Sequence, residues 1–339
     1  MEKNKRSNNL QLIRFIAALI VIISHSHPLS DGTRDIVTVL SGDTLYIGPY
    51  GLYPFFVFSG FLIAGSLLRK KEVKTWSFFK ARLVRLIPAL AFTVFMCALL
   101  GVFFTTLTPK EYFTSSQTYK YLLNSIFVIV HDLPGVFTSN HYVSTVNGSL
   151  WTMCIEFLCY VACFVLFKLK WMEKKKLVIL SPFVFAVCAV LIYILPHDIK
   201  TGVRAGMVFY IAILYYVFWE DLKFKPIYTV IAGVLTFATM LLRISYVGIY
   251  VFFPYFLLSI AFSSHQCSEK LAKLGDYAYG IYLWGFPVQQ AIIQLSGGTM
   301  NAYLNAAISI PVSIALALFT YHFIEKPSAA AFLKPKKAG

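Results

Sequence analysis

The chain has 339 residues, of which 58% are hydrophobic and only 13% charged, and its formal net charge at pH 7 is +15. Its mean hydropathy is +0.70, and long apolar stretches recur from end to end. This composition excludes a soluble globular domain, and nucleic-acid binding would need a basic soluble domain that the sequence does not contain. The sequence therefore predicts an all-α polytopic membrane protein that forms a single domain over residues 1–339.

Ten transmembrane helices are expected, and the basic residues orient them. With the N-terminus inside, 24 of the 30 Lys and Arg residues fall on the inner side and 6 on the outer side. Both termini are therefore predicted to be cytoplasmic. The apolar stretch 120–131 is too short to cross and is interpreted as an interfacial helix. The expected spans lie near residues 10–27, 46–68, 84–107, 149–168, 177–196, 204–219, 226–242, 247–263, 273–293 and 303–324.

Two ionisable residues, Arg14 and His25, lie on the first span. Such residues are costly to bury in a membrane and usually have a function. Their separation corresponds to about 1100° of helical rotation, so both project from one face, roughly 16 Å apart along the axis. His25 comes just before Pro28, which is expected to end the helix. Its imidazole could act as a general base toward a hydroxyl, or it could cap the helix by bonding a neighbouring carbonyl.

His27 does not extend this pair into a metal site. It lies two residues after His25, about 200° further around the helix, and no cluster supplies further ligands. No bound metal is predicted.

Glu156 lies about two turns into the fourth expected span. The predicted topology places it roughly 10 Å below the outer surface, at a depth comparable to that of His25. A carboxylate at this depth needs a partner. It could orient the imidazole and stabilise its protonated form, or it could form a structural ion pair with an arginine of another helix.

Arg82 and Arg85 stand three residues apart, on one face of a helix that continues into the third span. Planar guanidinium groups bind phosphate oxygens bidentately, so this pair suits phosphate recognition at the membrane surface. Contact with lipid headgroups is the alternative interpretation.

Ser59 and Glu325 are two further candidate site residues, although structural roles would account for both. Ser59 and Gly60 are small residues in an aromatic-rich span, where they allow close approach of another helix or of a narrow ligand. Glu325 ends the last span at the expected cytoplasmic face, either as a solvated end or paired with Arg14 or Arg85.

Taken in order, these segments resemble the acyltransferase-3 family of membrane acyltransferases, and the resemblance covers nearly the whole chain. Each segment alone is a weak signal, but six in the right order make a strong one. The segments are Arg14 to His25, Phe55–Ile63 with Ser59, Arg82-x-x-Arg85 with Pro88, Ser149-Leu150-Trp151 ahead of Glu156, Leu274–Trp284, and Ile324-Glu325-x-Pro327.

The resemblance implies a multi-pass enzyme of the bacterial cytoplasmic membrane with no permanently bound cofactor. It would transfer an acyl group, usually acetyl from acetyl-CoA, to a hydroxyl of a cell-surface glycan or a lipid-linked saccharide.

The residues before Arg14 depart from the family pattern. Gly285 follows Trp284 where a histidine is common, so the role of a histidine at that position does not carry over to this chain. The chain ends about fifteen residues after its last span, so we expect the form without an extra C-terminal domain. The residues that match the family motifs are Arg14, His25, Arg82, Arg85, Glu156 and Glu325.

The residues and the resemblance together predict how a donor would bind. Acyl-CoA would enter from the cytoplasm with its phosphates on Arg82, Arg85 and Arg14, and its thioester would then lie near His25. His25 would activate the acceptor hydroxyl or carry the acyl group itself, with Glu156 supporting the imidazole. The competing hypothesis is a transporter or flippase for a polyprenyl-linked sugar or small solute, although no paired halves with broken helices are evident.

Overall fold

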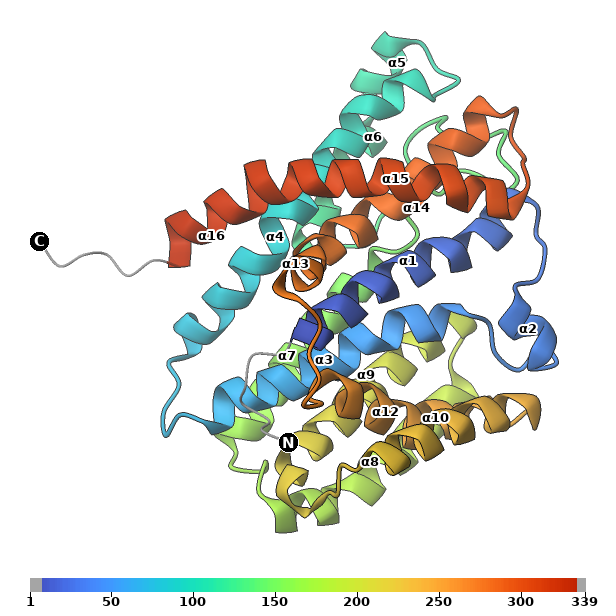
Figure 1. Cartoon of the computed structure of the whole chain (residues 1–339). Helices are drawn as coiled ribbons and strands as arrows, with labels where there is room; N and C mark the ends of the chain where they lie inside the picture. Colours follow the sequence, from blue (N-terminus) through green and yellow to red (C-terminus); the bar gives the residue numbers. More distant parts are fainter. Residues whose placement is uncertain (1–7, 334–339) are drawn as a thin grey trace, which may run out of the picture. The chain divides into compact units, whose positions relative to one another are not determined.

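The computed structural model describes residues 8–333, and within that range it leaves out the side chains of residues 197, 198 and 333. Over these residues the chain is helical and has no β-strand, with only isolated bridges at Thr105–Val136 and Asp132–Thr145 (Figure 1). The predicted all-α fold is confirmed for this part of the chain. Both termini lie outside the described residues.

Helices long and apolar enough to cross a membrane number six in the described part of the chain, which agrees with a polytopic membrane protein. The other four expected spans coincide with helices that are shorter or more polar. The count of ten therefore stays a prediction. The six candidates are Asn8–Ser30, Gly48–Leu68, Thr75–Phe103, Trp151–Lys168, Lys174–Ile194 and Ala302–Phe332.

The helices pack as two compact units, each drawn from three segments of the chain. Unit 1 comprises residues up to Ala17, Ile36–Glu72 and Ile155–Gly275; unit 2 comprises Ala18–Asp35, Val73–Cys154 and Asp276 onward. Two helices run from one unit into the other: α1 (Asn8–Ser30) and α7 (Trp151–Lys168).

The remaining elements each belong to one unit, apart from the short turn η5 (Lys273–Tyr277) at the last boundary. Those of unit 1 are α2 (Ile36–Leu40), α3 (Gly48–Leu68), α8 (Lys174–Ile194), α9 (His197–Val217), η3 (Trp219–Asp221), α10 (Pro226–Leu241), α11 (Ser245–Val247), η4 (Gly248–Phe252), α12 (Phe253–Ala261) and α13 (Glu269–Ala272). Those of unit 2 are α4 (Thr75–Leu100), η1 (Gly101–Phe103), α5 (Pro109–Thr114), α6 (Ser116–Tyr121), η2 (Leu122–Ile126), α14 (Ala278–Leu295), α15 (Ala302–Thr320), η6 (Tyr321–Glu325) and α16 (Lys326–Leu333).

The core of unit 1 forms where α3 packs against α9. A Cβ atom at Gly60 would collide with the backbone oxygen of Phe209 on α9, so only glycine permits this approach. The sequence-based expectation that a small residue here allows close helix packing is confirmed. One turn of α3 presents Phe61 to an aromatic cluster, with ring centroids 5.1 Å from both Tyr216 and Trp219 and 5.0 Å from Phe262.

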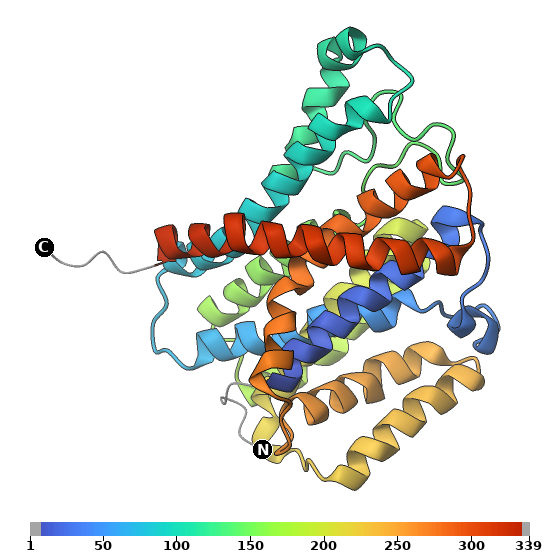
Figure 2. The same cartoon turned by 45° about the horizontal axis from the view of Figure 1, so that its top comes forward.

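A second layer of unit 1 is formed by α10 and α12, which lie side by side in both views of the chain (Figures 1 and 2). The turn η4 also packs on α10, and α12 contacts both α3 and α9. The layer therefore connects the last helices of unit 1 to its core.

Unit 2 is built around the antiparallel pair α14 and α15, joined by a short loop (Figures 1 and 2). Buried polar side chains link the two helices. Gln289 donates from Nε2 to Oδ1 of Asn305 at 2.9 Å, and Trp284 donates from Nε1 to Oγ1 of Thr320 at 2.9 Å. Such bonds hold membrane helices together, because burial leaves polar groups no water to bond.

Two helix ends, at Pro28 and at Glu325, differ from the sequence-based expectation. Helix α1 continues through Pro28 to Ser30 instead of ending before it. The last span likewise does not end at Glu325: a π-helical turn, η6, leads into α16, which contains Pro327. Proline removes one backbone hydrogen bond, and near a helix end or beside a wider π turn this loss is tolerated.

Candidate active site

His25 lies in the part of α1 that belongs to unit 2, where α14 holds it in place. Its half-buried ring packs edge-on against Phe286, with centroids 5.3 Å apart. One turn earlier, the Ile22 carbonyl accepts a hydrogen bond from Nε2 of Gln289 at 2.9 Å. A Cβ atom at Gly285 would lie 2.8 Å from Cγ1 of Ile22, so α14 can approach α1 here only because residue 285 is glycine.

The end of α1 is fixed to the start of α15. Oδ2 of Asp31 accepts from the Ala302 amide at 3.2 Å, and its Oδ1 accepts from the Thr33 hydroxyl at 2.6 Å. Partial burial raises the pKa of the Asp31 carboxyl, but the hydrogen bonds from Thr33 and Ala302 outweigh it and hold that pKa below its usual value. His27 is buried and bonds Oγ1 of Thr33 through Nδ1 at 2.9 Å, which gives it a structural role.

Glu156 and Ser59 come together in unit 1. Ser59, buried on α3, donates to Oε1 of Glu156 at 2.8 Å, and Tyr160, one turn further along α7, donates a hydrogen bond to the same oxygen. No cation among the described residues forms an ion pair with Glu156. The pairing of Glu156 with His25 stays a prediction, because the two residues belong to different units.

Arg14 lies on the portion of α1 in unit 1 and is half-buried. Its Nη1 donates to Oε1 of Gln11 at 3.2 Å, and the guanidinium carbon stands 5.9 Å from the ring centroid of Phe55 on α3. The first and second motif segments therefore meet at Arg14 and Phe55.

Arg82 and Arg85 lie on α4 in unit 2. The guanidinium of Arg82 stacks on the ring of Phe78, 3.9 Å from its centroid, and bonds the Phe78 carbonyl at 3.0 Å, whereas Arg85 is exposed. The next residue, Leu86, accepts from the hydroxyl of Tyr279 on α14 at 2.8 Å. The turn η6, which carries the half-buried Glu325, also packs on α4.

The segment around Trp151 packs on α14 as well. Trp151 is half-buried and begins α7. The following Thr152 shares a 2.7 Å hydrogen bond with the hydroxyl of Tyr282, and that hydroxyl also donates to the Ser149 carbonyl at 3.1 Å. Helix α14 thus contacts three of the other motif segments within unit 2: those of His25, of Arg82 and Arg85, and of Trp151.

Several residues that support these positions were missed by the sequence reasoning. Phe286, Gln289 and Tyr160 carry no charge and stand in apolar segments. The only available signal was the four-residue spacing of Glu156 and Tyr160, which places both on one helix face. No group of three or more His, Cys, Asp or Glu side chains among the described residues could hold a metal ion.

Comparison with known proteins defines the class. A family model described as an acyltransferase domain matches residues 7–322, so the chain belongs to the acyltransferase-3 family. The named relatives agree with this class, and the protein is an acyltransferase of the O-acetyltransferase type.

The relatives include one that matches over nearly its full length. An O-acetyl transferase of Shigella phage Sf6 is 25% identical over 334 residues, covering 95% of this chain and 96% of the phage protein. The peptidoglycan O-acetyltransferase OatA of Listeria monocytogenes is 25% identical over 83% of this chain, and O-acetyltransferase OatA of Staphylococcus aureus is 26% identical over 92%. The chain spans only 51% and 59% of those two proteins. No solved structure matches.

Proposed function

We propose that this protein is a membrane O-acetyltransferase that moves an acyl group, normally acetyl, from cytoplasmic acyl-CoA to a hydroxyl of an extracytoplasmic or lipid-linked glycan. The relatives named above support a glycan acceptor, since one of them is named for peptidoglycan. The predicted orientation, with most cations on the inner side, supports access of the donor from the cytoplasm.

The main structural support for the proposal is the packing and hydrogen bonding of the His25 imidazole. Its ring is held by Phe286, yet neither imidazole nitrogen forms a hydrogen bond with a described residue. A capping histidine would bond a carbonyl through one of these nitrogens. A positioned imidazole with both nitrogens available suits proton transfer instead.

The imidazole of His25 would act as the general base of the transfer reaction. As the acceptor oxygen attacks the thioester carbonyl carbon, His25 takes the hydroxyl proton; the carbon–sulfur bond breaks, and the proton passes to the departing CoA thiolate. In the covalent variant, an imidazole nitrogen attacks the thioester carbon, the carbon–sulfur bond breaks, and CoA leaves as the thiol with the imidazole proton. The acceptor hydroxyl then attacks the acyl carbon, the carbon–nitrogen bond breaks, and the hydroxyl proton returns to the imidazole. Glu156, held in one orientation by Ser59 and Tyr160, would support the imidazolium charge.

The phosphates of the donor would bind Arg82, Arg85 and Arg14. The roughly 16 Å between Arg14 and His25 along α1 is comparable to the length of an extended pantetheine arm. This arrangement would bring the thioester from the cytoplasmic surface to the depth of His25.

The experiment is to incubate purified protein in nanodiscs with acetyl-CoA and a host lipid extract, and to measure release of the free CoA thiol. We expect wild-type protein to release CoA and His25→Ala to release none, while both unfold at similar temperatures. His131→Ala, which changes an exposed loop histidine, is the matched control and should behave as wild type. Equal release by His25→Ala would contradict the proposal, and inert wild-type protein that does not bind CoA would favour the transporter hypothesis.

A further inference from the structure

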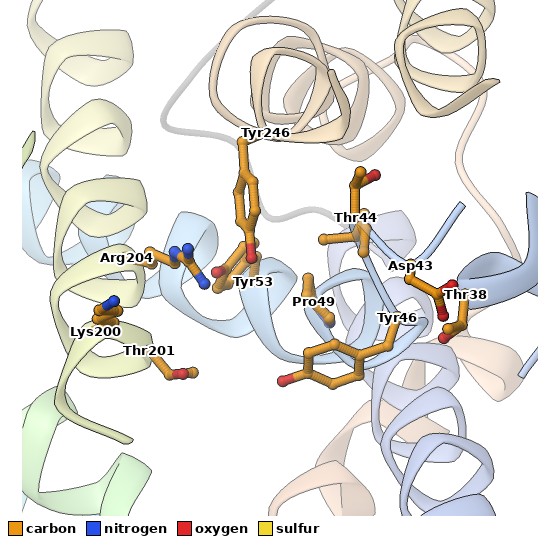
Figure 3. Close-up of a pocket in the computed structure, with 11 residues that line it drawn as sticks. Thr38, Asp43, Thr44, Tyr46, Pro49, Tyr53, Lys200, Thr201, Arg204 and Tyr246 are labelled. Carbon is orange, nitrogen blue, oxygen red and sulfur yellow. The ribbon is translucent and has the colours of Figure 1, made fainter. Parts of the chain in front are cut away.

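A cavity of about 360 Å³ opens at one end of unit 1, and none of the motif residues described above lines it. Its walls are the loop between α2 and α3, the beginning of α3, the first turns of α9 and the turn α11 (Figure 3). All of these elements belong to unit 1. The volume lies near the lower end of the range for ligand sites, roughly 300–1,000 Å³.

Two cations define one side of this cavity. Lys200 and Arg204 are four residues apart on α9 and therefore share a face. The Arg204 guanidinium stands 4.2 Å from the ring centroid of Tyr246, and Figure 3 shows it directed toward the middle of the cavity. Neither Lys200 nor Arg204 forms an ion pair with a described side chain. Both charges are therefore available to an anionic ligand.

The cavity is not uniformly basic. Asp43 lies at the side opposite Lys200 and Arg204 (Figure 3). A ligand with one anionic end and a hydroxyl-rich remainder would match both sides, because a carboxylate accepts hydrogen bonds from neutral hydroxyls. A simple inorganic anion would occupy only the cationic side.

Aromatic rings line the space between the two sides. Tyr246 and the buried Tyr53 meet beside Arg204, and the half-exposed Tyr46 extends its hydroxyl toward α9 (Figure 3). Tyrosine offers a flat apolar face and a polar tip. Such faces suit the C–H side of a sugar ring, while the tips and nearby threonine hydroxyls suit its hydroxyl groups.

The wall formed by the α2–α3 loop is fixed before any ligand arrives. Oγ of Ser41 donates to the Leu45 carbonyl at 2.8 Å, and Thr44 shares a 2.9 Å hydrogen bond with Ser245. Gly42 has a left-handed φ of 61°, and a Cβ atom there would lie 2.7 Å from Nε of Arg243. A preformed wall avoids the cost of ordering a loop on binding.

The position of the cavity argues against the CoA donor as its occupant. It lies at the start of α3, whereas the cations Arg69, Lys70 and Lys71 follow the end of that 21-residue helix, about 30 Å away. The cation-rich end is the predicted cytoplasmic end. The cavity therefore faces the side where the acceptor, and not the donor, is expected.

We propose that this cavity binds the acceptor through a sugar phosphate ester, with the phosphate on Lys200 and Arg204 and the sugar ring among the tyrosines. The proposal rests on the proposed function. The phosphate ester could belong to a polyprenyl diphosphate-linked sugar or to an anionic phospholipid headgroup, and the cationic pair alone would accept either. The part of the cavity lined by tyrosines suits a sugar ring, and this favours the lipid-linked saccharide.

The test measures binding of farnesyl-diphospho-N-acetylglucosamine to the full chain in phosphatidylcholine nanodiscs. We expect saturable binding to wild type, at least a tenfold higher Kd for the Lys200→Ala/Arg204→Ala double variant, and an intermediate Kd for Arg204→Lys, which keeps the charge but loses the planar fork. Lys174→Ala, a surface cation of the same unit, is the control and should bind normally. His25→Ala should also bind normally.

Competing ligands and activity separate the outcomes. Wild-type affinity in the double variant overturns the proposal. Should the double variant not fold, wild-type affinity in a combined Arg204→Lys/Tyr46→Ala variant overturns it. Complete displacement by phosphatidylglycerol or by acetyl-CoA also overturns it, in favour of a headgroup or a donor site. Probe binding that depends on Lys200 and Arg204 without any CoA release supports the cavity and refutes the proposed function. CoA release that depends on His25, combined with unaltered probe binding in the Lys200 and Arg204 variants, supports the proposed function and refutes the proposal for the cavity.

Discussion

The orientation of the Glu156 carboxylate is set by two hydroxyl donors. Ser59 and Tyr160 both donate to Oε1, which fixes the orientation of the carboxylate, and Oε2 accepts no hydrogen bond from the described residues. A structural ion pair would instead place a cation here. The arrangement therefore leaves one oxygen of an oriented carboxylate available to a further donor, as its proposed role beside an imidazole requires.

Replacing Glu156 by glutamine should lower kcat roughly 100-fold or more, because the neutral amide cannot stabilise an imidazolium. Tyr160→Phe and Ser59→Ala each remove one hydrogen bond to the carboxylate, worth about 1.5–3 kcal/mol. We expect each to lower kcat about tenfold and to leave the KM for acetyl-CoA unchanged. CoA-release kinetics check this, and full kcat in the Glu156→Gln variant would refute the role.

The arginine pair of α4 allows a second residue-level test. Replacing both Arg82 and Arg85 by Ala should raise the KM for acetyl-CoA about tenfold or more with a smaller change in kcat, since phosphate contacts act on binding. Lys71→Ala, an exposed cation in the loop before α4, is the control. Unchanged KM and kcat in the double variant would favour the lipid-contact interpretation.

Between elements, α14 packs closely on α1 at the site. Gly285→Ala should destabilise unit 2 by about 1–3 kcal/mol, because the new methyl group would lie 2.8 Å from Cγ1 of the buried Ile22. Ile22→Ala removes that carbon, so the double variant should be more stable than the sum of the two single effects predicts. Thermal unfolding in nanodiscs measures this, and strictly additive effects would contradict the packing.

The link between α1 and α15 should give stability a pH dependence. The hydrogen bonds from Thr33 and Ala302 hold the pKa of Asp31 below its usual value of 3.8, so ionised Asp31 stabilises the fold above that pH. The contribution is lost as the pH falls through the lowered folded-state pKa. Wild type should therefore unfold at a higher temperature than Asp31→Asn at pH 6, and the difference should shrink below about pH 4. A constant difference would show that Asp31 acts through packing alone.

At the level of elements, the sequence predicted the long helices but not where they stop, and the stretch 120–131, expected as one interfacial helix, is helical only as far as Ile126. Pro28 was expected to end the first helix and Glu325 to end the last span, yet α1 contains Pro28 and helix continues from η6 into α16. A proline costs one hydrogen bond, and sequence does not reveal whether neighbouring packing offsets that cost. The role of Gly60 was predictable, because a small residue in a bulky apolar helix is typical of a close helix–helix contact.

For the whole molecule, charge and periodicity identified the candidate residues but not their partners. Arg14, His25 and Glu156 stood out because ionisable groups are rare in apolar helices. The Ser59–Glu156 hydrogen bond joins residues 97 positions apart, and the cavity near Arg204 combines three distant segments. Such pairings depend on tertiary packing, which a single sequence does not encode in any local pattern. Neutral supporting residues such as Gln289 and Tyr160 were missed for the same reason.

We propose that acyl-CoA at the cytoplasmic face supplies the acyl group of a glycan ester through His25. This is tested by supplying acetyl-labelled CoA to sealed membrane vesicles of either orientation and measuring alkali-labile label in the glycan fraction. We expect label in inside-out vesicles with wild-type protein, and none in right-side-out vesicles or with His25→Ala. Label that forms equally in both orientations, or that persists in His25→Ala, would contradict the account.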